Sequence, residues 1–240
     1  MNGTTSPTLP AARAHRLWRR VRHSATFQFA FFLLLILASR SALADWNYVP
    51  SGSMKPTILE GDLIFVDRLA YDLKVPFTRV RLAEWGNPER GDVVVALSPE
   101  GGERIVKRVV GLPGDKIVLS GQTLTVNGER PTLAPLDGPA IAGLDARDLE
   151  THGLATETVL GHTRRLMVGH APPSLPTSGT FTVPPGHYFL VGDHRNNSRD
   201  SRIYGAVPRA DILGRATRVI GSMDITGDYS IRWGRFFEPM

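Results

Sequence analysis

Short apolar runs separated by turn-forming residues fill most of the chain after Asp45. Glycine, proline and aspartate stand between the runs, and no long stretch here repeats its apolar residues with the period of about 3.6 residues that marks a helix. Apolar runs bounded by such turns are typical of strands. The sequence therefore predicts a mainly β domain, with strands at 63–66, 93–97, 105–110, 117–119, 124–126, 188–191 and 213–220.

Residues 129–179 break this pattern. Proline, glycine, alanine and threonine with scattered charges replace the apolar runs. A long irregular stretch within a compact domain is typical of an inserted or covering segment. We expect a small insertion or cap there, and a β core formed by residues 45–128 and 180–240.

An uncharged apolar segment at residues 24–39 precedes the β region. A membrane-spanning helix needs about 20 apolar residues, a length that is reached if the segment extends to Ala44 and the Arg40 side chain reaches the membrane surface. Arginines are concentrated before it, and the positive-inside tendency places such residues in the cytoplasm. The pattern predicts a basic cytoplasmic tail at 1–23, a transmembrane anchor at 24–44 and an exported remainder.

A cleavable signal peptide is the alternative for this segment, because the small residues Ala42 and Ala44 follow the apolar stretch. Either alternative exports the rest of the chain. The formal net charge of +5 comes from the basic N-terminal region, since acidic and basic residues nearly balance after Asp45. We therefore expect no nucleic-acid partner.

Metal and thiol chemistry have little support in the sequence. The chain has no cysteine, which excludes disulfides, thiolate metal sites and cysteine nucleophiles. The seven histidines show no paired ligand spacing such as HExxH, and no glycine-rich nucleotide-binding loop occurs. We expect no metal and no other cofactor.

The segment SGSMKPT at residues 51–57 can expose a serine hydroxyl. Its glycine permits an unusual backbone turn, and Pro56 restricts how the chain leaves that turn. Ser53 is the candidate nucleophile, although a flexible serine and glycine linker is an alternative for the same residues. A serine hydroxyl also needs a neighbouring base to become a useful nucleophile.

The strand expected at 105–110 offers such a base. Strand alternation places Ile105, Lys107 and Val109 on one face, so one cation shares an apolar face. Arginine stays protonated in proteins, whereas burial can remove the proton from a lysine. Lys107 is therefore the candidate base of this strand, and an edge strand guarded by charges is the alternative.

The polar segment at residues 192–202 reads as a loop. Histidine is the commoner general base, so a triad of Ser53, His194 and Asp200 remains a rival to the lysine. A turn rich in side-chain to backbone hydrogen bonds is the third possibility for this loop.

Five motifs, in order along the chain, closely resemble those of bacterial type I signal peptidases, the leader peptidases that use a Ser/Lys dyad. They are PSGSMKPT at 50–57, GDLIFV at 61–66, RGDVVV at 90–95, KRVVGLPGD at 107–115 and the polar loop at 192–205. The resemblance implies an antiparallel β catalytic core with an inserted region, preceded by one transmembrane helix. It also implies a bacterial inner-membrane enzyme with a cytoplasmic N-terminus and its catalytic domain on the periplasmic face.

The same resemblance implies the catalytic roles. Ser53 would attack the scissile carbonyl, and neutral Lys107 would accept the proton of Ser53 and later protonate the leaving amine. The Ser53 backbone N–H and the Ser51 hydroxyl would form the oxyanion hole, a donor pair that stabilises developing charge.

Supporting and substrate-binding residues follow from the resemblance too. Ser198 would orient the lysine amine, and Asp200 and Arg202 would form an ion pair that holds the loop. Substrates of this family carry small residues, typically Ala-X-Ala, before the cut, and Val49 and Val106 are candidates for lining the pockets. The implied partners are preproteins with signal peptides and membrane lipid.

The polar loop departs from the commonest family pattern, because His194 and Asn196 replace an asparagine and an aspartate and Tyr204 replaces a tryptophan. None of the three carries an implied catalytic role. A dedicated maturation peptidase with few substrates, as in conjugation-associated relatives, is therefore an alternative to a general signal peptidase. A noncatalytic anchored β-domain that binds peptides is the third hypothesis.

Overall fold

The computed structural model describes residues 24–75, 78, 80–136, 141, 143–170 and 178–240, and the predicted cytoplasmic tail at 1–23 lies outside them. This part of the chain is mainly β, as predicted. The strands are β1 (Ala44–Tyr48), β2 (Asp62–Asp67), β3 (Asp72–Lys74), β4 (Arg81–Glu84), β5 (Val93–Leu97), β6 (Arg104–Gly111), β7 (Lys116–Ser120), β8 (Thr123–Val126), β9 (Thr132–Pro135), β10 (His152–Val159), β11 (His162–Gly169), β12 (Ser178–Thr182), β13 (His187–Val191), β14 (Val207–Pro208) and β15 (Ile212–Ser222). The helices are α2 (Ala25–Ala42), α3 (Ala146–Thr151), α4 (Ser201–Tyr204) and the 3-10 turns η1 (Gly52–Met54), η3 (Arg209–Asp211) and η4 (Trp233–Arg235).

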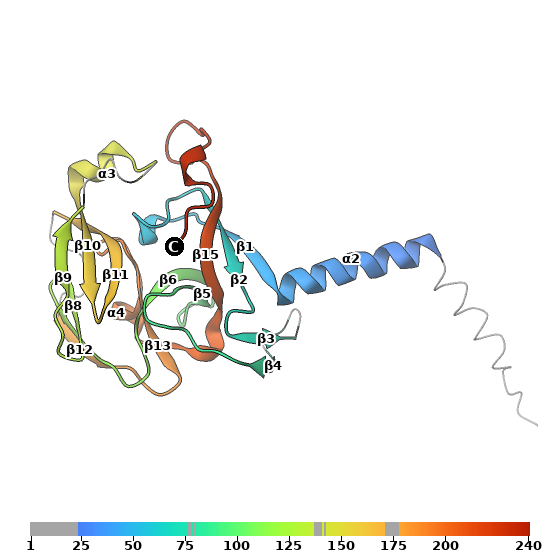
Figure 1. The fold of residues 1–240 in the computed structure, drawn as a ribbon, viewed down its shortest axis with the longest axis horizontal. Coiled ribbons are helices and arrows are strands. Elements are labelled where there is room, and N and C mark those ends of the chain that lie inside the picture. The colour runs from blue at the N-terminus through green and yellow to red at the C-terminus, as the bar shows by residue number, and fades with distance from the viewer. Residues whose placement is uncertain (1–23, 76–77, 79, 137–140, 142, 171–177) are drawn as a thin grey trace, which may run out of the picture.

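A seven-stranded sheet in the order β1-β2-β15-β5-β6-β13-β14 forms the centre of the domain (Figure 1). Its neighbouring strands pair antiparallel. Each of the seven strands expected from the sequence lies within or coincides with an observed strand. The long strand β15 connects the two halves of the sheet, because it pairs with β2 on one side and β5 on the other.

Strand β6 has a central position in this sheet. It pairs with β5, where Lys107 lies opposite Val94, and with β13, where Arg108 lies opposite Val191. Four of the five residues of β5 are buried, which explains why its sequence is a continuous apolar run rather than an alternating one. A lysine in β6 is therefore covered by neighbouring strands instead of lying at a sheet edge.

Two three-stranded sheets complete the main architecture, in the orders β12-β7-β8 and β11-β10-β9. The first encloses a cluster of apolar residues that includes Ile117, Leu124 and Phe189. The second lies within the segment expected as an insertion, and α3 immediately precedes its strand β10 (Figure 1). Strand β12 begins at Ser178 and pairs with β7, so the expected boundary after residue 179 falls inside a strand.

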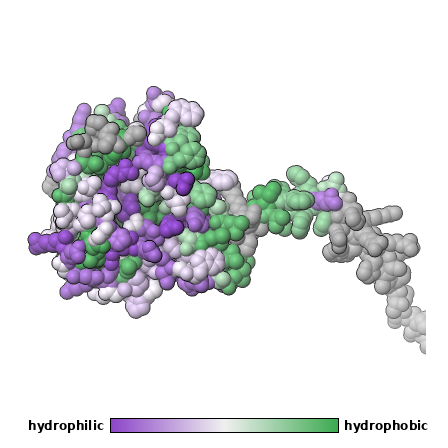
Figure 2. Space-filling model, in the orientation of Figure 1, coloured by the Kyte–Doolittle hydropathy of each residue, from purple (hydrophilic) through white to green (hydrophobic). Residues whose placement is uncertain are grey.

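Helix α2 forms within the expected anchor segment and extends away from the β domain (Figure 1). Its middle carries exposed apolar side chains such as Phe29, Leu34 and Ile36. Figure 2 shows apolar colouring along this helix and on the adjoining face of the domain. None of the helices in the described ranges is sufficiently long and apolar to cross a membrane.

Candidate active site

Ser53 lies in the turn η1, on the connection between β1 and β2. The two ends of this connection are joined by backbone hydrogen bonds from Val49 N to Asp62 O and from Gly61 N to Val49 O, each 2.9 Å long. Ser51, directly before η1, is exposed and has an extended backbone. The turn thus holds Ser53 on a loop whose two ends are closed by hydrogen bonds.

Lys107 reaches this turn from β6. Its Nζ lies 2.6 Å from the Ser53 Oγ, within hydrogen-bond distance. The lysine is buried, with 4% of its surface exposed. The candidate nucleophile and the candidate base, 54 residues apart in the chain, are therefore in direct contact.

Burial lowers the pKa of Lys107 to about 8, although the nearby carboxylates of Asp200 and Asp193 oppose the shift. The cause is the loss of hydration of the charged amine in a covered strand. With a pKa near 8, roughly one lysine in ten is neutral at pH 7. A neutral amine beside a serine hydroxyl can accept its proton.

The loop that follows β13 packs behind the Ser53–Lys107 pair. Asp200 accepts hydrogen bonds from Gly192 N at 3.0 Å and from Arg202 Nη2 at 2.8 Å. Burial opposes the charge of Asp200, but Arg202 and the Gly192 N–H outweigh it, so the pKa of Asp200 is lowered. The structure brings Asp200 and Arg202 together as an ion pair inside the protein, where both side chains are almost fully buried.

Gly192 is in close contact with two of the candidate residues. A Cβ at this position would lie 2.2 Å from the Ser198 Oγ and 2.4 Å from the Ser53 carbonyl oxygen. Ser198 is itself buried. Within the part of the chain that the structure describes, no hydrogen bond joins Ser198 to Lys107, so its expected orienting role stays a prediction.

A cavity of about 110 Å³ opens beside the Ser53–Lys107 pair. Val49 and Val106 line it, as do Ser51 and Ser53, so four of the predicted site residues share one cavity with Lys107. Val49 is buried and Val106 partly buried. Across the described ranges, no cluster of three or more histidine, aspartate or glutamate side chains is placed to hold a metal ion.

The family described as "Signal peptidase, peptidase S26" matches residues 22–220 of the chain. The protein belongs to this signal peptidase family. That assignment makes it a serine endopeptidase, as the sequence motifs predict, and excludes the noncatalytic peptide-binding hypothesis.

Two relatives with known names support the family assignment. A signal peptidase I of Pseudomonas fluorescens is 36% identical over 83% of this chain and 72% of its own length, and one of Pseudomonas aeruginosa is 35% identical over the same shares. The crystal structure of a signal peptidase I from Enterococcus faecalis aligns with 54% of this chain and 96% of that chain, at 30% identity and a TM-score of 0.33. This TM-score is too low to compare the folds, so the assignment depends on the sequences.

In this signal peptidase, His194, the alternative candidate for the general base, contacts the backbone of the serine turn and not the Ser53 hydroxyl. The His194 Nδ1 lies 3.1 Å from the Gly52 carbonyl oxygen, and its backbone N–H donates to the Ser53 carbonyl at 3.1 Å. Among the described residues, no hydrogen bond joins the His194 ring to the Ser53 Oγ or to Asp200. The side chains of the rival triad are therefore not assembled for proton transfer.

A buried ion-pair network next to the site escaped the sequence reasoning. Arg108 Nη2 lies 2.7 Å from Asp193 Oδ2, and the Thr57 hydroxyl donates to the same oxygen at 2.6 Å. Arg108 follows the candidate base, and Thr57 follows the serine turn, so the network ties the two together. Arg108, Asp193 and Thr57 are polar residues within motifs that are otherwise explained by turns and strands. This polarity was the signal in the sequence that could have indicated the network.

A second network joins the insertion to the polar loop. Glu157 of β10 binds Arg164 of β11, and it also accepts from Arg195 Nη2 at 2.7 Å. The neighbouring backbone continues this contact, because Met167 N donates to Asp193 O at 3.0 Å and Arg195 N donates to Met167 O at 2.9 Å. The insertion is thus bonded directly to the loop that packs behind Ser53. The irregular sequence of residues 129–179 did not indicate this.

Proposed function

We propose that this protein removes signal peptides from exported preproteins, with Ser53 as the nucleophile and Lys107 as the general base. The observation that carries the proposal is the 2.6 Å contact between the Lys107 Nζ and the Ser53 Oγ. Such a contact between a nucleophile and a base with a lowered pKa is the arrangement that serine catalysis requires. Membership of the signal peptidase family supplies the reaction class.

The proposed reaction begins with proton transfer from Ser53 to the neutral amine of Lys107. The Ser53 Oγ forms a bond with the carbonyl carbon before the cleavage point, and the carbonyl oxygen becomes an oxyanion. When this intermediate collapses, the C–N bond breaks and the Lys107 ammonium protonates the leaving amine. Water, deprotonated by Lys107, then attacks the carbonyl carbon of the Ser53 ester. The bond from that carbon to the Ser53 Oγ breaks, the Lys107 ammonium returns a proton to the Oγ, and the signal peptide is released with a free carboxylate.

The oxyanion hole is proposed to consist of the Ser53 backbone N–H and the Ser51 hydroxyl. Both residues line the cavity beside Lys107, which supports the assignment. Removal of one such donor typically lowers kcat by about 10²- to 10³-fold. Ser198, Asp200 and Arg202 are proposed to support the dyad from behind rather than to contact the substrate.

The cavity is proposed to accept small side chains before the cleavage point, as in Ala-X-Ala. Its volume of about 110 Å³ and its lining by Val49 and Val106 support this choice, because branched side chains on the wall leave little space for a larger residue. Aliphatic walls also favour an apolar side chain over a charged one.

We further propose that the segment 24–44, most of which forms α2, holds the enzyme at the bacterial inner membrane as a single-pass anchor, with a cytoplasmic N-terminus and the β domain on the periplasmic face. The exposed apolar side chains of α2 support a lipid contact. The apolar face of the β domain beside this helix would then lie near the membrane surface (Figure 2). The proposed partners are therefore preproteins and membrane lipid, with no nucleic acid and no metal.

The proposed catalytic core comprises residues 45–128 and 180–240, with residues 129–179 as the insertion. Strands β9, β10 and β11 form a sheet of their own within the insertion, which supports the division. A dedicated maturation peptidase with few substrates is the second candidate. The observation that favours it is His194, which replaces the usual asparagine of the polar loop and contacts the serine turn.

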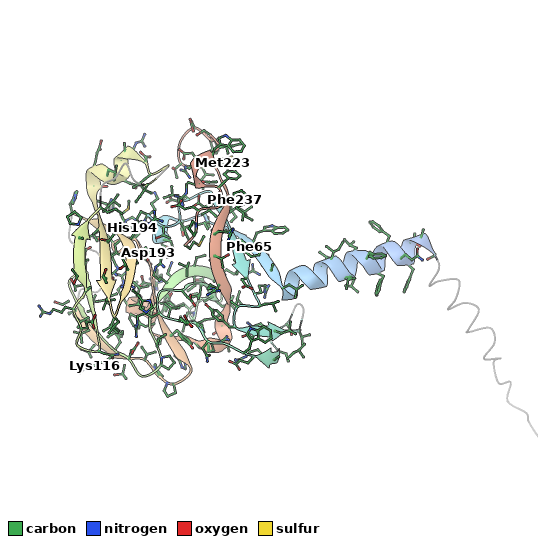
Figure 3. The ribbon with its side chains drawn as sticks, viewed as in Figure 1. Phe65, Lys116, Asp193, His194, Met223 and Phe237 are labelled. Carbon is green, nitrogen blue, oxygen red and sulfur yellow. The ribbon has the colours of Figure 1, made fainter. Side chains whose placement is uncertain are left out.

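The decisive experiment is cleavage of a preprotein bearing Ala-X-Ala by the detergent-solubilised full chain, with the product N-termini identified. Ser53→Ala should abolish cleavage, and Lys107→Ala should lower it by about 10²- to 10⁴-fold, the usual contribution of a general base. Lys116→Ala is the matched control, because Lys116 is an exposed lysine of β7 (Figure 3). Cleavage by Ser53→Ala at the wild-type rate would refute the proposal.

Depletion of the protein from its host separates the two substrate ranges. A general signal peptidase predicts that many unrelated precursors accumulate in the membrane. A dedicated maturation peptidase predicts the accumulation of one or a few.

A further inference from the structure

Lys55, two residues after Ser53, forms two ion pairs. Its Nζ lies 2.6 Å from Glu60 Oε2, in the connection that follows the serine turn, and 2.8 Å from Asp148 Oδ2, on α3 of the insertion. Burial opposes the charge of Lys55, but the hydrogen bonds that its ammonium donates to Asp148 and Glu60 outweigh burial and raise the pKa of Lys55. Lys55 is therefore a cation that joins the serine turn to α3.

His194 contacts the same turn on the residues before Lys55. Because the Gly52 carbonyl can only accept, the His194 Nδ1 must carry the hydrogen in their 3.1 Å contact. Burial and the neighbouring His152 lower the pKa of His194 to about 4, so the ring is neutral at pH 7. The backbone N–H of His194 also donates to the Ser53 carbonyl at 3.1 Å. One residue thus holds two consecutive carbonyls of the turn.

The ring of His194 is covered by the insertion. The His152 ring packs edge-on against it, with centroids 4.6 Å apart and an interplanar angle of 83°. Figure 3 shows His194 and Asp193 beside β10 and β11. His152 begins β10 and follows Asp148 by four residues, so the contact with Lys55 and the contact with the His194 ring both come from one short segment, residues 146–152.

We infer that residues 146–152 of the insertion position the nucleophile, and that Lys55 and His194 are the positioning residues through which they act. Asp148 holds Lys55, His152 holds the His194 ring, and His194 in turn fixes the carbonyls of Gly52 and Ser53. The Ser53 Oγ is thereby kept at its 2.6 Å distance from Lys107. This inference rests on the proposed function, since it assigns a role in the Ser53 and Lys107 chemistry.

The inference predicts a selective loss of turnover. A displacement of about 1 Å between reacting groups can lower the rate about 100-fold, whereas neither Lys55 nor His194 lines the cavity that is proposed to receive the substrate. Loosening the turn should therefore lower kcat and leave KM nearly unchanged.

The test compares two substitutions of nearly equal shape at His194 in the full-length enzyme. His194→Leu removes the donor to Gly52, whereas His194→Asn provides an amide N–H in its place. We expect kcat to fall about 10-fold in His194→Leu with KM within about 2-fold, and to stay within about 3-fold of wild type in His194→Asn, because loss of the hydrogen bond to Gly52 misplaces Ser53. The active-site concentration is measured by titration with a serine-acylating probe.

A second pair of variants tests the insertion side and remains informative if His194→Leu does not fold. Asp148→Asn removes the charge that holds Lys55, and we expect kcat to fall about 3- to 10-fold because the ion pair is largely buried. Glu150→Gln is the matched control, since it removes an exposed carboxylate from the same helix. All rates are measured at a temperature well below each variant's Tm.

The possible outcomes separate the inference from the proposed function. Wild-type kcat per titrated site in both His194→Leu and Asp148→Asn, even with lowered Tm values, would make these contacts purely structural and overturn the inference. An equal loss in His194→Asn and His194→Leu would also overturn it, since the donor would then be irrelevant. If Ser53→Ala cleaves like the wild type, the proposed function fails and the inference fails with it.

Discussion

Gly192 lies directly behind Ser53, so close that an added Cβ would be 2.4 Å from the Ser53 carbonyl oxygen. The same atom would lie 2.2 Å from the Ser198 Oγ. Backbone of the polar loop and backbone of the serine turn are therefore in contact without any space for a side chain. The position of the candidate nucleophile depends on this close packing.

Gly192→Ala should lower kcat/KM by at least about 10-fold, because the methyl group must displace either the serine turn or Ser198 from the active geometry. Steady-state cleavage of a signal-peptide substrate measures the effect. Gly153→Ala is a suitable control, since a Cβ there would meet its nearest atom at 3.6 Å. Equal activity of the two variants would contradict the proposed positioning by Gly192.

The pH dependence of cleavage should follow the ionisation of Lys107. Its pKa of about 8 means that the neutral, proton-accepting amine becomes rarer as the pH falls. Below about pH 8, kcat/KM should therefore decrease about tenfold per pH unit, and above it the rate should level off. A profile that is flat between about pH 6 and 9 would argue against lysine as the base.

Lys107 should also destabilise the folded protein at neutral pH. Burial lowers its pKa from 10.5 to about 8 in the folded state, so the unfolded chain binds more protons between these pH values. Stability should rise with pH across this window, and the full penalty should be present below about pH 8. Lys107→Met should therefore raise the free energy of unfolding at pH 7 by up to about 3 kcal/mol while abolishing cleavage.

Denaturant unfolding of wild type and Lys107→Met at pH 7 and pH 10 measures this effect. The difference between the two proteins should shrink at the higher pH. Lys116→Met serves as the control, because Lys116 is exposed. A difference that does not change with pH would show that the substitution acts through packing instead of through charge.

Val106→Ala should widen the cavity that is proposed to select small residues. We expect kcat/KM to rise about 5-fold for a substrate with valine directly before the cut, since the added space removes a steric clash worth about 1 kcal/mol. Cleavage after alanine should change little. Val118→Ala in β7, outside the lining of this cavity, provides the control, and unchanged specificity in Val106→Ala would move the substrate pocket elsewhere.

Two charges in the middle of α2 should weaken the proposed membrane contact. Leu34→Asp combined with Leu35→Asp places carboxylates among exposed apolar side chains, and partitioning into phospholipid vesicles should fall about tenfold or more. Lys116→Asp is the control, because it changes the net charge by the same amount on the exposed side of β7. Unchanged partitioning of the double variant would exclude α2 as the contact.

Local sequence patterns predicted the mainly β class and seven of the fifteen described strands. Apolar runs between glycine and aspartate turns located seven strands of the sheets, because strand formation and turn formation depend on neighbouring residues. The anchor segment is an exception, because its helix is shorter than the predicted span. The sequence suggested a spanning helix at 24–44, whereas the helix covers Ala25–Ala42, and no described helix meets the length and apolarity of a span.

The candidate site shows the same division between local and long-range information. The motifs around Ser53 and Lys107 indicated both residues, because each motif has a local turn or strand character that can be read from its own residues. The sequence could not choose between Lys107 and His194 on residue type alone. In the structure Lys107 contacts Ser53 and the His194 ring contacts Gly52, which supports the proposed lysine base. Burial of the lysine and the partner of the ring both depend on which distant segments cover them.

The sequence by itself thus determined where seven of the described strands run, which serine and lysine are the candidate dyad, and which protein family the chain resembles. Only the tertiary structure decided that Lys107 is buried beside Ser53, that Asp193 pairs with Arg108 across 85 residues, and that the insertion reaches the serine turn through Asp148 and Lys55, 93 residues apart. The physical reason is that hydration, pKa and ion pairing depend on spatial neighbours. A local sequence pattern does not show which distant residues surround a side chain in the folded protein.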